Sequence, residues 1–234
     1  MTCPPLCEQV ERIRDALHRP LPGLAVHREM APRPRPGLER ILDPDLDCLH
    51  AAVLVLLYPE RVGQAQLALV LTRRTELVNS HRGQISLPGG RVEAGESHIQ
   101  AAIREAQEEL GLDPARCEIL GHLSPVYIPR TNFCVYPVVA FTSEPPAFQP
   151  SPVEVAEVIE VPVRDLLDPS HRRQETWELH GEPVLVPYFA FGRHKVWGAT
   201  AMILAELAAV IDLARQRGGS GPDEPGETPV ASSG

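Results

Sequence analysis

A predicted helix with three glutamates on one side constrains this chain more than any other feature of its sequence. Between about His98 and Leu110 the apolar residues recur at helical spacing and define a face that packs on a sheet: Ile99, Ala102, Ile103, Ala106 and Leu110. Glu105, Glu108 and Glu109 stand at positions i, i+3 and i+4, so their carboxylates converge on the adjacent sector. Because carboxylates one turn apart repel each other, the stripe favours a cation site. A solvated acidic face with salt bridges to arginines is the ordinary alternative.

The chemistry of these ligands indicates which cation would fit. Carboxylate oxygens are hard ligands, and a set of them suits Mg²⁺ or Mn²⁺ rather than Zn²⁺. Such an ion binds carboxylates and substrate phosphates together, neutralises diphosphate oxygens and lowers the pKa of a bound water. The helix therefore predicts Mg²⁺ or Mn²⁺ as the cofactor.

A glycine-rich loop, Pro88 to Glu96, stands directly before this helix. Its glycines allow backbone turns and a close approach of the backbone to a metal or phosphate. Ser97 or Glu96 is expected to cap the helix, and Gly111 is expected to end it. The loop turns the acidic stripe into a candidate diphosphate site.

Loop and helix together follow the pattern G-x5-E-x7-R-E-U-x-E-E-x-G-U, where U is apolar, and the matching residues are Gly90, Glu96, Arg104, Glu105, Ala106, Glu108, Glu109, Gly111 and Leu112. This pattern resembles the Nudix box. The resemblance implies that Glu105, Glu108 and Glu109 bind the divalent metal and that Gly90 offers its carbonyl to it. It also implies that Arg104 and Glu96 form a pair that orients the loop and the glutamates.

The segment upstream of the box resembles the signature of the coenzyme A diphosphatase branch, with matches at Leu71, Thr72, Arg74, Gly83, Pro88, Gly89 and Gly90, and with His81 also typical. The resemblance implies hydrolysis of CoA or acyl-CoA to 3′,5′-ADP and (acyl-)4′-phosphopantetheine, an enzyme acting on phosphorus-containing acid anhydrides. Arg74 is expected to clamp a phosphate. The expected substrate-binding residues are Arg74, His81, Arg82 and Gly83.

The signature is not met everywhere. Asn79 stands where an arginine is expected, while Thr75 and Leu87 are departures of conserved shape. Asn79 removes a charged partner, which keeps open the same chemistry on ADP-ribose, NADH or another nucleoside diphosphate derivative. A Nudix-fold binding module without turnover is the less favoured alternative, because such modules typically lose glutamates that this chain keeps.

A further glutamate is expected near the site. Glu154 and Glu157 occupy the stretch where Nudix enzymes often place another metal-binding or basic glutamate. Strand alternation alone does not decide which one points inward. Glu154 is the favoured candidate, so the expected catalytic set is Glu105, Glu109 and Glu154.

The organisation of the chain predicts an α/β fold, a Nudix-type α/β/α sandwich with a mixed β-sheet between helices. Residues 1–45 are expected to form an N-terminal helix (6–18) and a Pro-rich strap without regular structure, and 46–216 the Nudix hydrolase domain. Strands are expected near 50–58, 66–72, 117–123, 134–141 and 155–161, followed by a short helix at 163–167, a hairpin at 176–191 and a last helix at 199–215. Residues 217–234 are expected to be a disordered tail.

Composition limits the partners and the compartment. A net charge of −9 argues against nucleic acid. No apolar run is long enough to span a membrane, so no membrane partner is expected. The five scattered cysteines indicate unpaired thiols in a reducing cytoplasm. The expected partner is a small, CoA-like diphosphate substrate, and a homodimer is left open.

Overall fold

The structure is a computed structural model that describes residues 4–35, 37–43, 45–75, 83–179 and 181–216. Its α-helices are α1 (Pro4–Leu17), α2 (Leu24–Met30), α3 (His98–Leu110), α4 (Val163–Leu167) and α5 (Gly198–Gln216). Short 3-10 helices lie at Leu38–Leu42, Pro114–Arg116 and Pro169–His171. None of the helices in this described part is both long and apolar enough to cross a bilayer.

The larger sheet is mixed. It contains β1 (Leu49–Pro59), β2 (Leu67–Arg74), β3 (Ile85–Ser86), β4 (Gly89–Arg91), β5 (Glu118–His122), β6 (Val126–Ile128), β7 (Phe133–Phe141) and β8 (Val155–Pro162). β1 runs parallel to β7 from Leu49 to Leu57, whereas the pairs of β1 with β2 and of β1 with β4 are antiparallel. β1 is central because it pairs with β2, β4 and β7.

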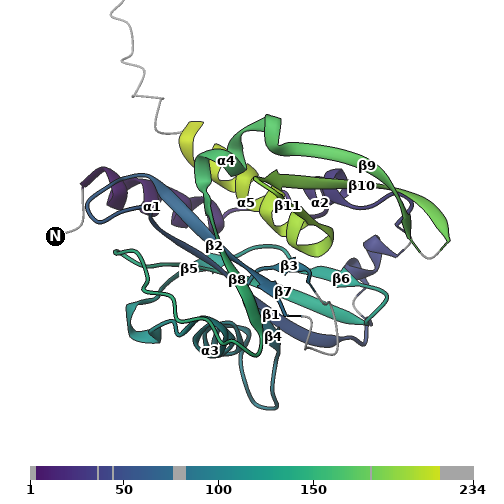
Figure 1. The fold of residues 1–234 in the computed structure, drawn as a ribbon, viewed down its shortest axis with the longest axis horizontal. Helices are drawn as coiled ribbons and strands as arrows, with labels where there is room; N and C mark the ends of the chain where they lie inside the picture. The colour runs from purple at the N-terminus through teal and green to yellow at the C-terminus, as the bar shows by residue number, and fades with distance from the viewer. Residues whose placement is uncertain (1–3, 36, 44, 76–82, 180, 217–234) are drawn as a thin grey trace, which may run out of the picture.

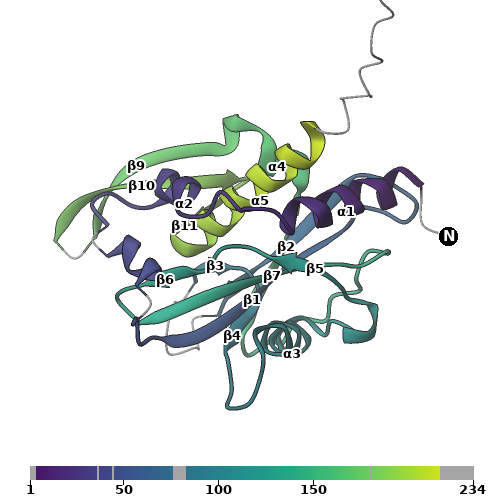
Figure 2. The same ribbon diagram turned by 180° about the vertical axis from the view of Figure 1, so that it is seen from behind.

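Helices cover both faces of this sheet (Figure 1), which confirms the predicted sandwich. On one face Ala52, Leu54, Leu56 and Tyr58 of β1 pack against the alanines of α3. On the other face Val55 and Leu57 join a larger core with α1 and α5. β1 is buried on both faces because its residues point alternately to the two sides. Figure 2 shows α1 and α2 lying beside α5 on this second face.

α3 has the boundaries that its sequence predicts. The Ser97 side chain accepts from the Gln100 amide, and the Gln100 side chain accepts from the Ser97 amide, which makes a capping box. Gly111 ends the helix in the left-handed conformation at φ 66°. The cap fixes where the helix starts, and so fixes which residues face the sheet.

A smaller antiparallel sheet contains β9 (Arg172–Leu179), β10 (Glu182–Phe191) and β11 (His194–Trp197). The predicted hairpin is confirmed, although its first strand begins earlier than expected. The backbone of Arg33 pairs with Leu185 of β10, so the strap before β1 runs along this sheet.

The expectations for the Pro-rich stretch and for the cysteines are wrong. The Pro-rich stretch contains α2, because the run Leu24–Met30 holds no proline and buries His27 and Met30. Cys48 and Cys134 form a disulfide, with Cα atoms 5.9 Å apart across 86 residues of sequence. The parallel pairing of β1 with β7 brings these two cysteines together, whereas Cys7 and Cys117 are free as expected. The tail expected at 217–234 lies outside the described residues.

Candidate active site

Gly90 and Glu105 form the centre of the glutamate cluster. Gly90 belongs to β4 and pairs with Ala52 of β1, directly beneath α3. A Cβ added at Gly90 would lie 2.5 Å from Cδ of Glu105, far inside contact distance. The carboxylate of Glu105 therefore lies against the backbone of the loop, and only glycine leaves it the room.

Arg104 connects the loop to the helix. Its Nε donates to Glu96 at 2.9 Å and its Nη2 donates to the second Glu96 oxygen at 3.1 Å. Nη2 also donates to the carbonyl of Arg91, at 3.1 Å. Hydrogen bonds from this guanidinium lower the pKa of Glu96, so the pair is ionised.

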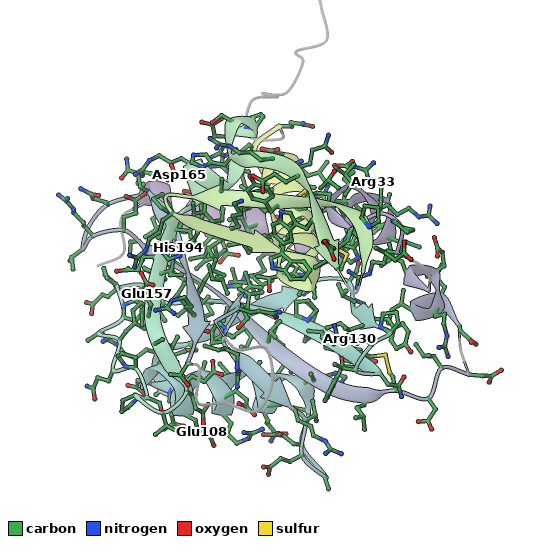
Figure 3. The ribbon with its side chains drawn as sticks, turned by 45° about the vertical axis from the view of Figure 1, so that its right-hand side comes forward. Arg33, Glu108, Arg130, Glu157, Asp165 and His194 are labelled. Carbon is green, nitrogen blue, oxygen red and sulfur yellow. A yellow bond between two sulfur atoms is a disulfide. The ribbon has the colours of Figure 1, made fainter. Side chains whose placement is uncertain are left out.

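The same guanidinium also contacts two of the predicted ligands. Nη1 of Arg104 lies 2.9 Å from Oε1 of Glu105 and 3.3 Å from Oε2 of Glu108. Glu108 is the most exposed of the cluster, with 57% of its side chain accessible, and it lies at the solvent edge of α3 (Figure 3). Arg104 thus holds Glu105 and Glu108 on one side of the helix.

Glu109 points inward and only 3% of its side chain is exposed. The Gly89 amide donates to its Oε2 at 3.3 Å, and Nη1 of Arg74 lies 3.3 Å from its Oε1. Burial raises the pKa of Glu109 to about 7, and the charges of Glu105 and Glu154 add to this rise, while Arg74 and the Gly89 amide oppose it. Buried carboxylates crowded in this way are a favourable place for a cation.

Glu154, the favoured further glutamate, lies near this cluster. Its charge raises the pKa of both Glu105 and Glu109. The amide of Thr75 donates to the Glu154 carbonyl at 2.9 Å, which fixes the start of β8 beside the end of β2. The structure therefore places Glu154 close enough to Glu105 and Glu109 for its charge to act on them.

Glu157, the other candidate, is used differently. It accepts from Nε of Arg73 at 3.0 Å and from Nη2 of Arg193 at 2.7 Å, and Nε2 of His194 lies 3.3 Å away. Hydrogen bonds from the two arginines lower its pKa, those of Arg193 first. Figure 3 shows Glu157 and His194 next to each other where β8 and β11 meet. Glu157 joins the two sheets instead of joining the cluster.

The structure does not describe all of the expected substrate-binding residues. His81 and Arg82, together with Asn79, lie outside the described residues. Gly83 is described and adopts the left-handed conformation at φ 64°, in the turn before β3. Arg74 is thus the expected substrate residue whose side chain the structure places at the cluster.

One contributor was not predicted as a site residue. Gly89 donates its backbone amide to Glu109, and a Cβ there would lie 2.6 Å from Cα of Val53. The double glycine was visible in the sequence, but a backbone donor leaves no side-chain signal. Its role follows only from the close pairing of β4 with β1.

The donor set fits a hard divalent cation. The charge of Glu154 raises the pKa of both Glu105 and Glu109, and the absence of a side chain at Gly90 lets the Glu105 carboxylate lie against the loop backbone. Nε of Arg74 is buried without a hydrogen-bond partner in the described part of the chain. Among the described residues no three His, Cys, Asp or Glu side chains are already arranged as a metal-binding group, and Arg104 and Arg74 form ion pairs with Glu105 and Glu109.

A sequence profile of the NUDIX domain matches residues 49–179. "Nudix hydrolase 22, chloroplastic" of Arabidopsis thaliana is 35% identical over 69% of this chain, and the match spans 55% of that protein's length. "Uncharacterized Nudix hydrolase NudL" of Enterobacter sp. (strain 638) is 36% identical over 76% of this chain and 90% of its own. The solved Nudix hydrolase RenU from M. Smegmatis aligns with a TM-score of 0.43 at 28% identity, covering 50% of this chain and 72% of that one.

Proposed function

The chain belongs to the NUDIX domain family, and from that premise we propose that it is a Mg²⁺- or Mn²⁺-dependent hydrolase of the diphosphate bond in CoA or acyl-CoA. The products are 3′,5′-ADP and (acyl-)4′-phosphopantetheine. Water adds to one phosphorus, the bridging P–O bond breaks, and two phosphate monoesters result. Both the hydrolytic activity and the CoA substrate are proposed here for the whole chain.

The position of Arg74 carries the proposal. Its Nη1 lies 3.3 Å from Glu109, and its Nε is buried without a partner among the described residues. An unpaired buried N–H costs about 1–3 kcal/mol, so an anionic oxygen of the substrate is its natural acceptor. A guanidinium beside a carboxylate cluster would offer one phosphate a donor, and a divalent ion held by the glutamates would supply further charge neutralisation.

Glu105, Glu108 and Glu109, with the Gly90 carbonyl, would hold the divalent ion. When bound, the ion supplies charge neutralisation at the diphosphate and a lowered pKa for the attacking water. Glu109 is buried and Glu154 lies near it, so either carboxylate is placed to accept the proton from water. Glu105 completes the proposed catalytic set.

Glu96 and Arg104 act as positioning residues. Their two-point contact ties the loop before α3 to the face of α3 that carries the glutamates. Because Arg104 also reaches Glu105 and Glu108, loss of the arginine would release two ligands and the loop together. Gly83, His81 and Arg82 complete the proposed contacts to the substrate.

Asn79 favours a second candidate function. It replaces the arginine of the CoA signature, and a lost cation weakens recognition of a highly anionic substrate. The second candidate is therefore the same hydrolysis on ADP-ribose, NADH or another nucleoside diphosphate derivative, with the same glutamates.

Product analysis separates the two. The protein is incubated with CoA, ADP-ribose and NADH side by side, with Mg²⁺, with Mn²⁺ and with a chelator. Release of 4′-phosphopantetheine from CoA, at a higher kcat/KM than the other substrates give, supports the proposal. Cleavage of ADP-ribose with intact CoA supports the second candidate. An Asn79→Arg variant, with Asn79→Gln as its uncharged control, is expected to lower KM for CoA.

A further inference from the structure

Two histidine rings meet away from the glutamates, at the end of the molecule where α3 begins. His50 lies in β1 and His98 is the first residue of α3. Nδ1 of His50 lies 3.1 Å from Nε2 of His98, and the two ring centroids are 5.2 Å apart. Because 48 residues separate them in sequence, the fold and not local geometry brings these nitrogens together.

Tyr136 of β7 holds the pair in place. The ring of His98 stacks on it with centroids 3.8 Å apart and planes 10° apart, and the ring of His50 lies 4.9 Å away. Tyr136 pairs with Ala52 in the parallel ladder, and His50 shares a face of β1 with Ala52. The three rings therefore gather on the sheet face that α3 covers, in an arrangement fixed before any ligand arrives.

We propose that His50 and His98 form a second metal site, which binds a transition-metal ion of the Zn²⁺ or Ni²⁺ class. Two imidazole nitrogens on one ion at about 2.1 Å are about 3.0 Å apart at a right angle and about 3.4 Å apart at a tetrahedral angle. The observed 3.1 Å lies between these limits. The pair supplies two ligands, and water or an added ligand supplies the others.

The ligand type separates this site from the glutamate cluster. Imidazole selects Zn²⁺, Cu²⁺ and Ni²⁺, whereas carboxylates select Mg²⁺ and Mn²⁺. Burial lowers the pKa of His98, and the nearby His50 and His122 add to the effect. An N–H···N hydrogen bond between the rings is the alternative use of the same spacing.

The site is also separate in space. His98 precedes Glu105 by seven positions, which corresponds to about 10 Å along the axis of α3. The loop from β4 to α3 connects the Gly90 end of the glutamate cluster to His98. An ion bound to both histidines would link β1 to the start of α3. It would thereby restrain the end of this loop that leads into α3. The inference does not depend on the proposed function.

Calorimetry on the full chain tests the proposal. The protein is freed of metal with a chelator, given excess Mg²⁺ to fill the carboxylates, and titrated with NiCl₂. The wild type is expected to bind one Ni²⁺ at this site, and His50→Gln and His98→Gln are each expected to bind it at least about tenfold more weakly. His18→Gln, an exposed histidine at the end of α1, is the matched control and should bind as the wild type does.

A second measurement needs no variant. Pulsed EPR of the wild type with one equivalent of Cu²⁺ counts the imidazoles on the ion, and two are expected; each Gln variant should show one. A saturable Ni²⁺ site that both Gln variants keep unchanged would overturn the proposal. So would the absence of Ni²⁺ binding, or a single imidazole in the wild-type spectrum. Far-UV circular dichroism verifies that the variants keep the secondary structure of the wild type.

Discussion

Gly90 lies so close to the carboxylate of Glu105 that any side chain at position 90 would displace it. This contact joins β4 to α3 at the centre of the proposed active site. The loop and the helix thus pack closely at one glycine, and the position of the Glu105 carboxylate, a proposed metal ligand, depends on the absence of a Cβ at residue 90.

Gly90→Ala is expected to lower kcat by about a hundredfold, because a displacement near 1 Å of a reacting group has this effect. The thermal midpoint should change little, since the added methyl group meets only the far end of the flexible Glu105 side chain. Gly95→Ala, in the same loop, is the control: nothing lies within 4 Å of its Cβ, but its φ of 83° is strained for alanine. Gly95→Ala should lose stability and keep activity. Equal activity of both variants would contradict the contact's importance.

Glu109→Gln removes a buried carboxylate that the proposal uses as ligand and as candidate base. The expected loss in kcat is at least about a hundredfold, with weaker binding of the ion when the metal-free protein is titrated with MgCl₂ or MnCl₂ in a calorimeter. Glu178→Gln, an exposed position on β9, is the matched control and should behave as wild type. Full turnover by Glu109→Gln would refute the assignment.

The buried network around Glu206 predicts an acid-sensitive fold. Burial alone would raise the pKa of Glu206, but hydrogen bonds from His27 and Ser124 outweigh it and the net pKa is lowered from 4.5. A lowered carboxyl pKa contributes stability that is present above the unfolded value and is lost as pH falls through the folded value. The unfolding free energy of the wild type should therefore fall more than that of Glu206→Gln between about pH 6 and about pH 3.

Urea unfolding of both proteins across this pH range gives the comparison. The two curves should converge toward low pH, where the wild-type carboxylate is protonated and no longer differs in charge from glutamine. Parallel curves over the whole range would show that Glu206 does not contribute through its charge.

Removal of the disulfide is expected to lower the free energy of unfolding. Cys48 and Cys134 close a loop across 86 residues, so the double variant Cys48→Ser/Cys134→Ser should lose about 2–4 kcal/mol of unfolding free energy. Cys7→Ser/Cys117→Ser, which removes two free thiols, is the control and should lose less. Reductant should destabilise the wild type and the control alike, and should leave the first variant unchanged.

Elements with a side-chain pattern were predictable from the sequence. The apolar spacing of α3 and the caps at Ser97 and Gly111 gave its limits, and the runs of β1 and β7 gave the strands of the core. β4 was expected to be part of a polar loop. It is a strand because Gly89 and Gly90 pair through their backbones with β1, and backbone pairing leaves no pattern in the side chains.

Relationships across the fold were beyond the sequence for a different reason. Spacing could not separate Glu154 from Glu157, since the partners that distinguish them, Arg73 and Arg193, come from β2 and from the turn before β11. The disulfide likewise depends on the parallel register of β1 with β7, which no local pattern of Cys48 or Cys134 encodes. Local order could be predicted from the sequence, whereas long-range pairing could not.

The contacts of Glu206 also bear on how such chains can be shortened or recombined. Its carboxylate in α5 accepts from the amides of Gly23 and Ser124 and contacts His27, so segments near both ends of the chain share one buried charge. Residues 49–179, the part shared with the family, include Ser124 but neither α5 nor the strap. A chimaera that moves only this stretch into a relative would carry α3 with it, but α5 and the strap would be those of the relative. The strap and α5 must therefore be exchanged together, because the contacts of Glu206 join them.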